Sequence, residues 1–294
     1  MSSFALPQFR EGQMVQEYRL RRLLGSSGST YTWEAENSAG EARALKFLPN
    51  PDAPATRQEI RAIQMVAALD HRHLAPVEKI CTVPRYFVIA APLADGSLQD
   101  YFDAYQSECG TGIEAVELCG YLRQAAAALD FLNLGKHRLG SWLGGMQHCD
   151  VKPQNLLLFG DTVRLSDHNL ASPTMRFLPL ETRIGSPAYV APELWNGRLT
   201  DATDQYALAV TYCYLRSGRL PKGAEAPRPG QTSHGAHAAP DLSMLSAPER
   251  PVVAKALAWV GRERWKSCTE FVTQLETVVT LTVRPTSASK IGTK

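Results

Sequence analysis

Four polar side chains in and just after the stretch HCDVKPQN (residues 148–155) have types and spacings that suit one kind of chemistry. Asp150, Lys152 and Asn155 stand directly before an apolar run, and Asp167 follows in RLSDHN. One carboxylate can orient a hydroxyl and take its proton, while an amide and a second carboxylate hold Mg²⁺ against phosphate groups. Lys152 can neutralise charge on the phosphate in transfer. The pattern therefore indicates phosphoryl transfer, a reaction that depends on positioning and electrostatics more than on a strong nucleophile.

The bulk composition excludes several classes of protein. The chain has 294 residues, is 44% hydrophobic and carries a formal net charge of +2, so it can bury one large core or two modest lobes. The balanced charge predicts no nucleic-acid partner. Six cysteines without a C-x-x-C pair indicate reduced thiols rather than disulfides or a zinc site. We expect a cytoplasmic protein without a membrane segment, because no stretch approaches the ~20 apolar residues of a spanning helix; the oligomeric state is unknown at this stage.

Hydrophobic periodicity predicts a β-rich part followed by a helical part. Alternation and breaker residues predict strands within residues 17–37, 41–48 and 86–93, and helical spacing predicts a helix over 55–71. After Leu93 the pattern turns helical, in segments 113–134, 200–218, 247–259 and 268–281. We expect Val116 among the buried positions of 113–134, Thr/Asp capping residues at the start of 200–218, and a helix end at Gly218. Residues 221–241, rich in Pro, Gly and Ala, predict a long surface loop.

In this context HCDVKPQN resembles the catalytic loop of protein kinases, and the position of Lys152 resembles the Ser/Thr-specific branch. ALKF resembles the strand that supplies the phosphate-binding lysine, GSPAYVAPE the end of the activation loop, and DQYALAV the buried helix whose Asp204 braces the catalytic loop. Arg264 matches the usual partner of Glu193. LADGSL and TDQYALAVTY are similar to the eukaryotic-like Ser/Thr kinases of bacteria.

The resemblance implies an α+β, two-lobed protein-kinase-like fold, with a small antiparallel β-rich N-lobe containing one regulatory helix and a larger, mainly helical C-lobe. It implies an N-terminal tail (1–13), a kinase domain (14–280, with lobes 14–92 and 93–280) and a flexible C-terminal tail (281–294). It also implies transfer of the ATP γ-phosphoryl group to protein Ser/Thr hydroxyls with Mg²⁺. Asp150 and Lys152 would be catalytic, and Asn155 and Asp167 would hold the metal. The implied nucleotide-binding residues are Leu24, Gly25, Gly28, Ala44, Lys46, Glu59 (as the ion-pair partner of Lys46), Pro92, Ala94 and Leu157.

Three motifs depart from the family pattern. In LGSSGST only Gly25 keeps the expected glycine place, which predicts a weakened phosphate lid; an ordinary hairpin turn is the alternative. His168 replaces a phenylalanine, so its ring must find a partner or sit exposed, while Asn169 tolerates the positive φ of the glycine it replaces. Cys149 replaces an arginine that binds activation-loop phosphate. We therefore hypothesise that activity does not need phosphorylation of the candidate sites Ser172, Thr174, Thr182 and Ser186.

Other interpretations compete with a catalytic kinase. The altered lid and the DHN motif favour a pseudokinase that binds nucleotide or partner proteins as a scaffold, whereas retention of all five polar groups of the reaction opposes it. A small-molecule phosphotransferase lacks the GSPAYVAPE segment and the lysine after the catalytic aspartate. Adjacent His148 and Cys149 do not form a thiol-protease dyad, because neighbours on an extended loop point apart. His71 and His73 are expected to be solvated rather than metal ligands.

Overall fold

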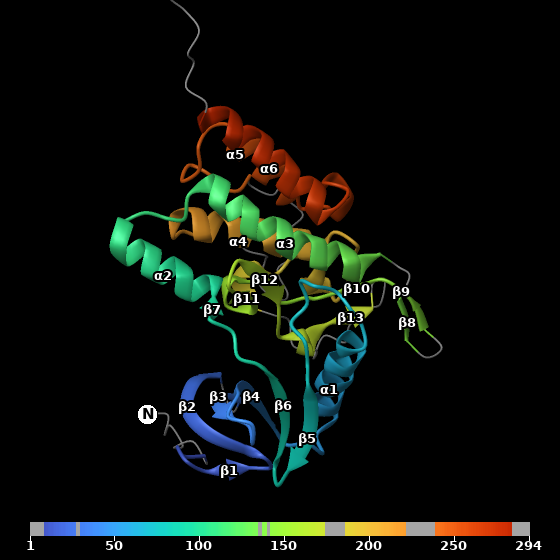
Figure 1. Ribbon diagram of the computed structural model, residues 1–294. Helices are drawn as coiled ribbons and strands as arrows, with labels where there is room; N and C mark the ends of the chain where they lie inside the picture. Colours follow the sequence, from blue (N-terminus) through green and yellow to red (C-terminus); the bar gives the residue numbers. More distant parts are fainter. Residues whose placement is uncertain are drawn as a thin grey trace, which may run out of the picture.

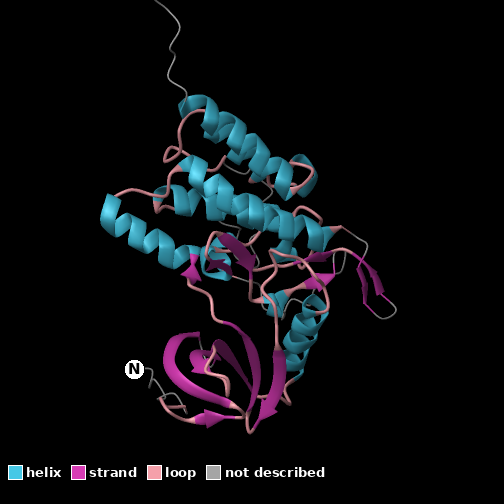
Figure 2. Cartoon of the chain, viewed as in Figure 1, coloured by secondary structure: helices cyan, strands magenta, loops and turns pink. Residues whose placement is uncertain are grey.

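The computed structural model describes residues 9–27, 30–134, 137–139, 142–173, 186–221 and 239–283. The chain forms two lobes, one built on a β-sheet and one on helices (Figure 1). Figure 2 shows the strands concentrated in the first lobe and the helices in the second. The predicted two-lobed α+β architecture is confirmed.

The N-lobe is a six-stranded antiparallel sheet in the order β1-β2-β3-β4-β6-β5 with one helix beside it (Figure 1). Side chains alternate between the two faces of each strand, and this alternation produces the core of the sheet. Leu45 and Phe47, two positions apart on one strand, are both fully buried. The helix buries Ile60 and Ile63 against Leu48 and Ile89 of the sheet. Its elements are β1 (Met14–Val15), β2 (Tyr18–Ser27), β3 (Thr30–Glu36), β4 (Ala42–Pro49), α1 (Pro54–Ala67), β5 (Lys79–Val83) and β6 (Tyr86–Pro92).

Residues 9–13 differ from the predicted N-terminal tail, because they pack on the sheet. The Phe9 ring centroid lies 4.2 Å from that of Phe47 and 5.1 Å from that of Tyr86. The backbone of Leu20 also exchanges hydrogen bonds with this segment, donating to the carbonyl of Gln13 and accepting from the amide of Gly12, both at 2.9 Å. Residues 9–13 therefore pack against the N-lobe sheet.

The C-lobe begins directly after β6 and buries its helices in one large core. Its helices are α2 (Leu98–Cys109), α3 (Ala115–Asn133), α4 (Thr203–Ser217), α5 (Glu249–Ala256) and α6 (Cys268–Val283). Its short strands are β7 (Gly96–Ser97), β8 (His137–Leu139), β9 (Trp142–Gly144), β10 (Met146–Gln147), β11 (Leu156–Phe159), β12 (Thr162–Leu165) and β13 (Ser172–Pro173). Single 3₁₀ turns complete it: η1 (Pro153–Asn155), η2 (His168–Leu170), η3 (Pro187–Tyr189), η4 (Pro192–Asn196) and η5 (Gly261–Glu263).

Several helix details differ from the sequence prediction. Helix α2 was not predicted, although Ser97 and Asp100 form a complete capping box at its start. Val116 was expected to be buried in α3 but is 49% exposed. No side chain caps α4 at its start, while Gly218 ends it in the left-handed conformation as predicted, with φ 70°. Helix α6 continues past the predicted boundary at residue 280 to Val283.

Most of the predicted surface loop 221–241, and the predicted tail from residue 284, lie outside the described residues. Among the described helices, none combines the length and the apolar character needed to cross a lipid bilayer.

Candidate active site

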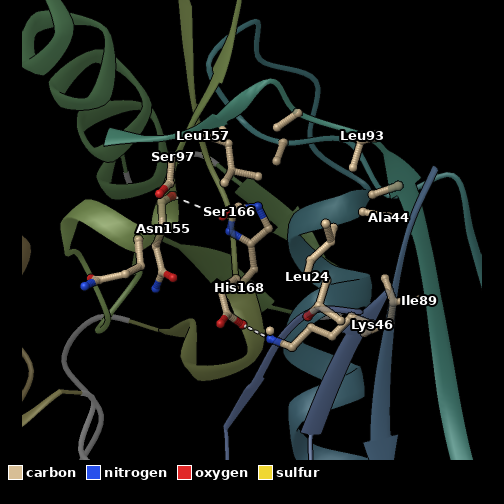
Figure 3. Close-up of a pocket in the computed structure, with 18 of the residues that line it drawn as sticks. Leu24, Ala44, Lys46, Ile89, Leu93, Ser97, Asn155, Leu157, Ser166 and His168 are labelled. Atoms are coloured by element: carbon tan, nitrogen blue, oxygen red, sulfur yellow. Dashed lines mark hydrogen bonds and ion pairs between the residues drawn. The ribbon is translucent and has the colours of Figure 1, made fainter. Parts of the chain in front are cut away.

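A cavity of about 940 Å³ lies where the two lobes meet (Figure 3). Most of the predicted site residues line it, namely Leu24, Gly25, Ala44, Lys46, Pro92, Ala94, Asp150, Lys152, Asn155, Leu157 and Asp167. Glu59 on α1 is not among the lining residues, and Gly28 lies outside the described residues. The structure therefore brings both the predicted catalytic pair and the two predicted metal ligands to one place.

Strand register explains the walls of this cavity. Alternation places Ala44 and Lys46 on the same face of β4, and Lys46 pairs in register with Thr32 of β3. Thr32 and Ile89 also line the cavity and were not among the predicted site residues. Both could have been predicted from the sequence, because residues that pair across strands with a predicted site lysine lie in the same surroundings as that lysine. On the opposite side, pairing of β7 with β11 sets Ser97 against Leu157 on the floor.

The catalytic loop is held by hydrogen bonds on both sides of Asp150. Lys152 Nζ donates to its Oδ2 at 2.8 Å, and Asn155 Nδ2 donates to the same oxygen at 2.9 Å. From the helix below, Asp204 accepts the amide of His148 at 2.6 Å and that of Cys149 at 2.8 Å. Burial raises the pKa of Asp204, although His148 and these amides act in the opposite direction. The predicted bracing role of Asp204 is confirmed.

Asp167 forms an ion pair with Lys46 across the cavity, drawn as a dashed line from Lys46 in Figure 3. Burial acts to raise the pKa of Asp167, but the charge and hydrogen bond of Lys46 outweigh it and lower that pKa, so the carboxylate is ionised at neutral pH. Its backbone is in the left-handed region, with φ 64°. The predicted partner of Lys46 was Glu59; the ion pair described for Lys46 is the one with Asp167, and the Lys46–Glu59 pair stays a prediction.

The side-chain oxygen atoms of Asn155 and Asp167, which line one cavity, are of the type that a hard divalent cation binds. Asn155 uses its Nδ2 to bond Asp150, which leaves the amide oxygen as a donor atom. Asp167 pairs with Lys46 through Oδ1, which leaves Oδ2. Mg²⁺ in phosphate-binding sites takes one or two protein oxygens and fills the remaining positions with phosphate and water. The two predicted metal ligands therefore fit Mg²⁺.

Comparison with known proteins decides the family. The model of the family described as "Protein kinase domain" matches residues 18–275. The chain belongs to this family.

Its relatives include three mycobacterial proteins. The chain is 29% identical over 257 residues to Serine/threonine-protein kinase PknH of Mycobacterium bovis (84% of this chain, 40% of that protein). It is 29% identical over 279 residues to Serine/threonine-protein kinase PknD of Mycobacterium tuberculosis (90% and 40%), and 28% over 267 residues to Serine/threonine-protein kinase PknI of Mycobacterium bovis (86% and 40%). This kinase domain thus spans about 40% of the length of the curated relatives it matches. The crystal structure of the PknI kinase domain of Mycobacterium tuberculosis superposes with a TM-score of 0.69 at 25% identity, covering 92% of this chain and 98% of that one.

Ser186 is a residue of the kinase domain that the sequence analysis treated only as a modification candidate. Its hydroxyl donates to Asp150 Oδ1 at 3.1 Å and accepts from Lys152 Nζ at 2.8 Å. Ser172, another candidate, is 8% exposed and donates to the carbonyl of Leu170 at 3.1 Å. Thr174 and Thr182 lie outside the described residues. Ser186 is therefore part of the site rather than a free loop serine.

Apolar packing surrounds the residue that replaces the phosphate-binding arginine. Cys149 packs with Val190, Leu194, Leu199 and Trp195, a group that we call the Cys149 cluster. Burial raises the pKa of the Cys149 thiol, and Asp204 and Asp150 add to this effect, so the thiol is uncharged. A phosphate would find an apolar surface here instead of a cation.

Beside this cluster, the activation segment is fixed to the C-lobe by a buried ion pair. Arg264 Nη1 and Nη2 donate to the two carboxylate oxygens of Glu193 at 2.9 and 2.7 Å. Arg264 also donates to the carbonyls of Ala202 and Ala258 at 2.8 and 2.9 Å. The predicted Arg264–Glu193 pair is confirmed.

The histidines differ most from expectation. His168 is 3% exposed, and neither of its ring nitrogens makes a hydrogen bond with the described residues, so it is neither partnered nor solvent-exposed. His73 was expected to be solvated but is 8% exposed, with Nδ1 2.9 Å from the carbonyl oxygen of Val163. His71 stacks on Phe131, with ring centroids 4.7 Å apart. These positions depend on contacts with distant strands and helices.

Proposed function

We propose that this kinase domain transfers the γ-phosphoryl group of ATP to Ser or Thr hydroxyls of protein substrates, with Mg²⁺ as the metal. The observation that carries the proposal is that Lys46, Asp150, Lys152, Asn155 and Asp167 line one cavity between the lobes. The relatives named above are Ser/Thr-protein kinases, which supports the same activity. No described group in the cavity offers a rival reaction of equal fit.

Asp150 is the proposed base of the reaction. Its Oδ2 accepts hydrogen bonds from Lys152 and Asn155, which fix the orientation of the carboxylate. Its Oδ1 accepts a hydroxyl hydrogen bond from Ser186, so the carboxylate has the geometry needed to bind an alcohol. An acceptor hydroxyl held in this way loses its proton to Asp150 as the phosphoryl group arrives. Lys152, 21% exposed in its side chain, stabilises negative charge on the transferring group.

The remaining predicted residues have roles in binding ATP. Mg²⁺ held by Asn155 and Asp167 supplies neutralisation of phosphate charge when it is bound. Lys46 orients the phosphates, and its present ion pair with Asp167 keeps both side chains in the cavity. The carbonyl of Pro92 and the amide of Ala94 face adenine in this proposal. The apolar residues Leu24, Ala44 and Leu157 enclose the flat rings of adenine.

The lid and the regulatory helix complete the proposal. Gly25 and Gly28 approach the phosphates with their backbone, and Glu59 pairs with Lys46 in the ATP-bound form. We further propose that the kinase domain extends from Phe9 to Val283, because both residues lie in packed or helical segments at the described limits of the fold.

The test is transfer of labelled γ-phosphate from Mg-ATP to the purified protein and to a generic basic protein. Asp150→Asn removes the base while keeping the shape of the side chain, so the rate should fall by about 10²- to 10⁴-fold. ATP-dependent thermal stabilisation is measured in parallel; ligand at about 100 times its Kd adds about 2.7 kcal/mol. Transfer by the wild type but not by the variant supports the proposal. A thermal shift in both proteins with no transfer in either would instead identify a nucleotide-binding pseudokinase.

A further inference from the structure

Four residues that face the cavity form a row across the N-lobe sheet. The row consists of Gly25, Thr32, Lys46 and Ile89, each paired in register with the next. Residues that pair directly across antiparallel strands point to the same face of a sheet, and all four line the cavity. Thr30, two positions before Thr32 on β3, lies on the same face and also lines the cavity. Two threonine side chains therefore lie on the sheet face that covers the site.

The register places these two threonines at the phosphate end of the proposed nucleotide site. Ala44, which encloses adenine in that proposal, lies two positions before Lys46 on β4, and Thr32 pairs with Lys46 rather than with Ala44. Two residues of strand advance by about 6–7 Å, so Thr32 lies one such step beyond the adenine wall and Thr30 lies a second step beyond it. Lys46 and Asp167, the proposed phosphate and metal ligands, form their ion pair at this end (Figure 3).

Both hydroxyl groups are available to a ligand. Thr30 and Thr32 are half-buried, and no hydrogen bond joins either side chain to another of the described residues. Gly25, beside Thr32, has no side chain, and a Cβ at that position would meet nothing within 4 Å. The row is therefore open on its cavity side next to Thr32, and a ligand in the cavity can reach the hydroxyl groups.

The charges that line the cavity do not favour an anion by themselves. The lining cations are Arg22, Lys46 and Lys152, and the lining carboxylates are Asp95, Asp100, Asp150 and Asp167. Three cations against four carboxylates give these lining side chains a formal charge of −1 before Mg²⁺ binds. Each of the three cations also forms an ion pair, with Glu34, Asp167 and Asp150 respectively. Phosphate binding therefore gains from neutral hydrogen-bond donors besides the metal, and hydroxyl groups are such donors.

We propose that the hydroxyl groups of Thr30 and Thr32 donate hydrogen bonds to the phosphate groups of the bound nucleotide. A hydroxyl that donates to a charged acceptor contributes more free energy than one that donates to a neutral acceptor. The lid, in which only Gly25 keeps the expected glycine place, thereby binds phosphate through side chains as well as through its backbone. This inference rests on the proposed nucleotide site and assigns two further residues to its phosphates.

The experiment compares a ligand that carries phosphates with one that does not. Calorimetric titration gives Kd for the non-hydrolysable analogue AMP-PNP with Mg²⁺, and for adenosine. Thr30→Val and Thr32→Val keep the branched shape of the side chain and remove the hydroxyl, whereas Thr32→Ser keeps the hydroxyl. Thr82→Val, at an exposed position of β5 outside the cavity lining, is the matched control. Thermal melting checks that each variant folds.

We expect each cavity valine variant to weaken AMP-PNP binding by about tenfold, the lower end of the range for a hydrogen bond to a charged group. Adenosine has no phosphate, so its Kd should stay within about twofold of the wild-type value in the same variants. Thr32→Ser should keep most of the AMP-PNP affinity, and Thr82→Val should change neither Kd. Unchanged AMP-PNP binding in either cavity variant overturns the inference for that threonine. An equal loss of adenosine binding also overturns it, because the threonine then shapes the cavity wall and does not bind phosphate.

Titrations of the wild type separate this inference from the proposed function. Binding of AMP-PNP by the wild type, together with unchanged binding by the valine variants, leaves the nucleotide site standing and removes the threonines from it. No binding of AMP-PNP by the wild type rejects the nucleotide site, and the inference with it. If adenosine binds too weakly to titrate, the contrast between Thr32→Val and Thr32→Ser decides, because only the serine keeps a hydroxyl.

Discussion

The hydroxyl of Ser186 donates a hydrogen bond to Oδ1 of Asp150 at 3.1 Å, across 36 positions of sequence. The amide of Ser186 donates to the same oxygen at 3.0 Å, and Lys152 Nζ donates to the hydroxyl at 2.8 Å. Ser186 directly precedes η3, so one serine joins the two proposed catalytic side chains to this turn. The position of η3 and the orientation of the base are therefore linked.

Ser186→Ala removes the hydroxyl contacts with Asp150 and Lys152 and keeps the backbone contact. We expect the transfer rate to fall by about tenfold to hundredfold, because each lost hydrogen bond involves a charged group worth about 1.5–3 kcal/mol. Ser186→Thr keeps the hydroxyl and should keep most of the rate. Initial rates with Mg-ATP, and thermal melting as a check on folding, decide the matter. An alanine variant as fast as the wild type would show that the contact has no part in the reaction.

Arg264→Leu leaves Glu193 buried without its cation. The Arg264 side chain is fully buried and that of Glu193 is 11% exposed, so we expect a loss of about 3–5 kcal/mol in the free energy of unfolding. Arg262→Ala, at a nearby exposed position, is the matched control and should change stability by less than about 0.5 kcal/mol. Urea denaturation measures both variants. Similar losses for the two would contradict a special role for the ion pair.

Removal of phosphate should leave the kinase domain active. The Cys149 cluster offers no cation to an activation-loop phosphate, so phosphatase treatment should change the transfer rate by less than about twofold. Alanine variants of Thr174 and Thr182 should give the same result. Ser186 is excluded from this set because its hydroxyl contacts Asp150 and Lys152. A large fall in the transfer rate after phosphatase treatment, or in either threonine variant, would contradict the hypothesis.

The lowered pKa of His71 predicts that the folded state loses stability in mild acid. Its Nδ1 accepts the amide hydrogen of His73 at 3.3 Å, and burial, followed by His73 and Arg72, lowers its pKa below the ordinary value of 6.5. The folded state thus binds fewer protons than the unfolded state below about pH 6.5. The contribution of neutral His71 to the free energy of unfolding is fully present above about pH 6.5. It is lost as the pH falls from there through the lowered pKa of His71 in the folded state. His71→Phe keeps the stack on Phe131 without the titration, so its melting temperature should fall less between pH 7.5 and pH 5.5 than that of the wild type.

Two glycines should respond to alanine in opposite directions. A Cβ at Gly112 would lie 2.2 Å from the carbonyl oxygen of Arg216, so the α2–α3 connection must move, and we expect Gly112→Ala to destabilise by about 1–3 kcal/mol. A Cβ at Gly120, on an exposed face of α3, would meet nothing within 4 Å. Gly120→Ala should stabilise by about 0.5–1 kcal/mol through helix propensity. Chemical denaturation of both variants under one set of conditions measures the contrast; changes of the same sign would refute the packing argument.

The sequence predicts best what is encoded locally. Asp150, Lys152 and Asn155 lie within one short loop, and the spacing alone places them together. The strand alternation around Lys46 and the cap at Gly218 are equally local, and both are found as expected. These features depend on backbone geometry over a few residues, which the residue types largely determine.

What the sequence does not predict depends on contacts between distant segments. His73 is buried because its ring meets the carbonyl of Val163, 90 positions away. Val116 is exposed because it lies off the buried stripe of α3, which carries Leu118, Leu122 and Leu129 at helical spacing, so its apolar type alone was misleading. The Ser186–Asp150 contact and the ion pair from Lys46 to Asp167 likewise arise only when the two ends of the site are brought together. Local patterns carry no information about which of several partners a long side chain will take.

The Cys149 cluster is an apolar contact between the catalytic loop and residues 190–199. An arginine–phosphate contact at this place would weaken as ionic strength rises, because mobile ions screen it. Contacts among Cys149, Val190, Leu194 and Leu199 are insensitive to screening but lose strength on cooling. At Cys149, the contact between the catalytic loop and residues 190–199 therefore responds to temperature rather than to salt.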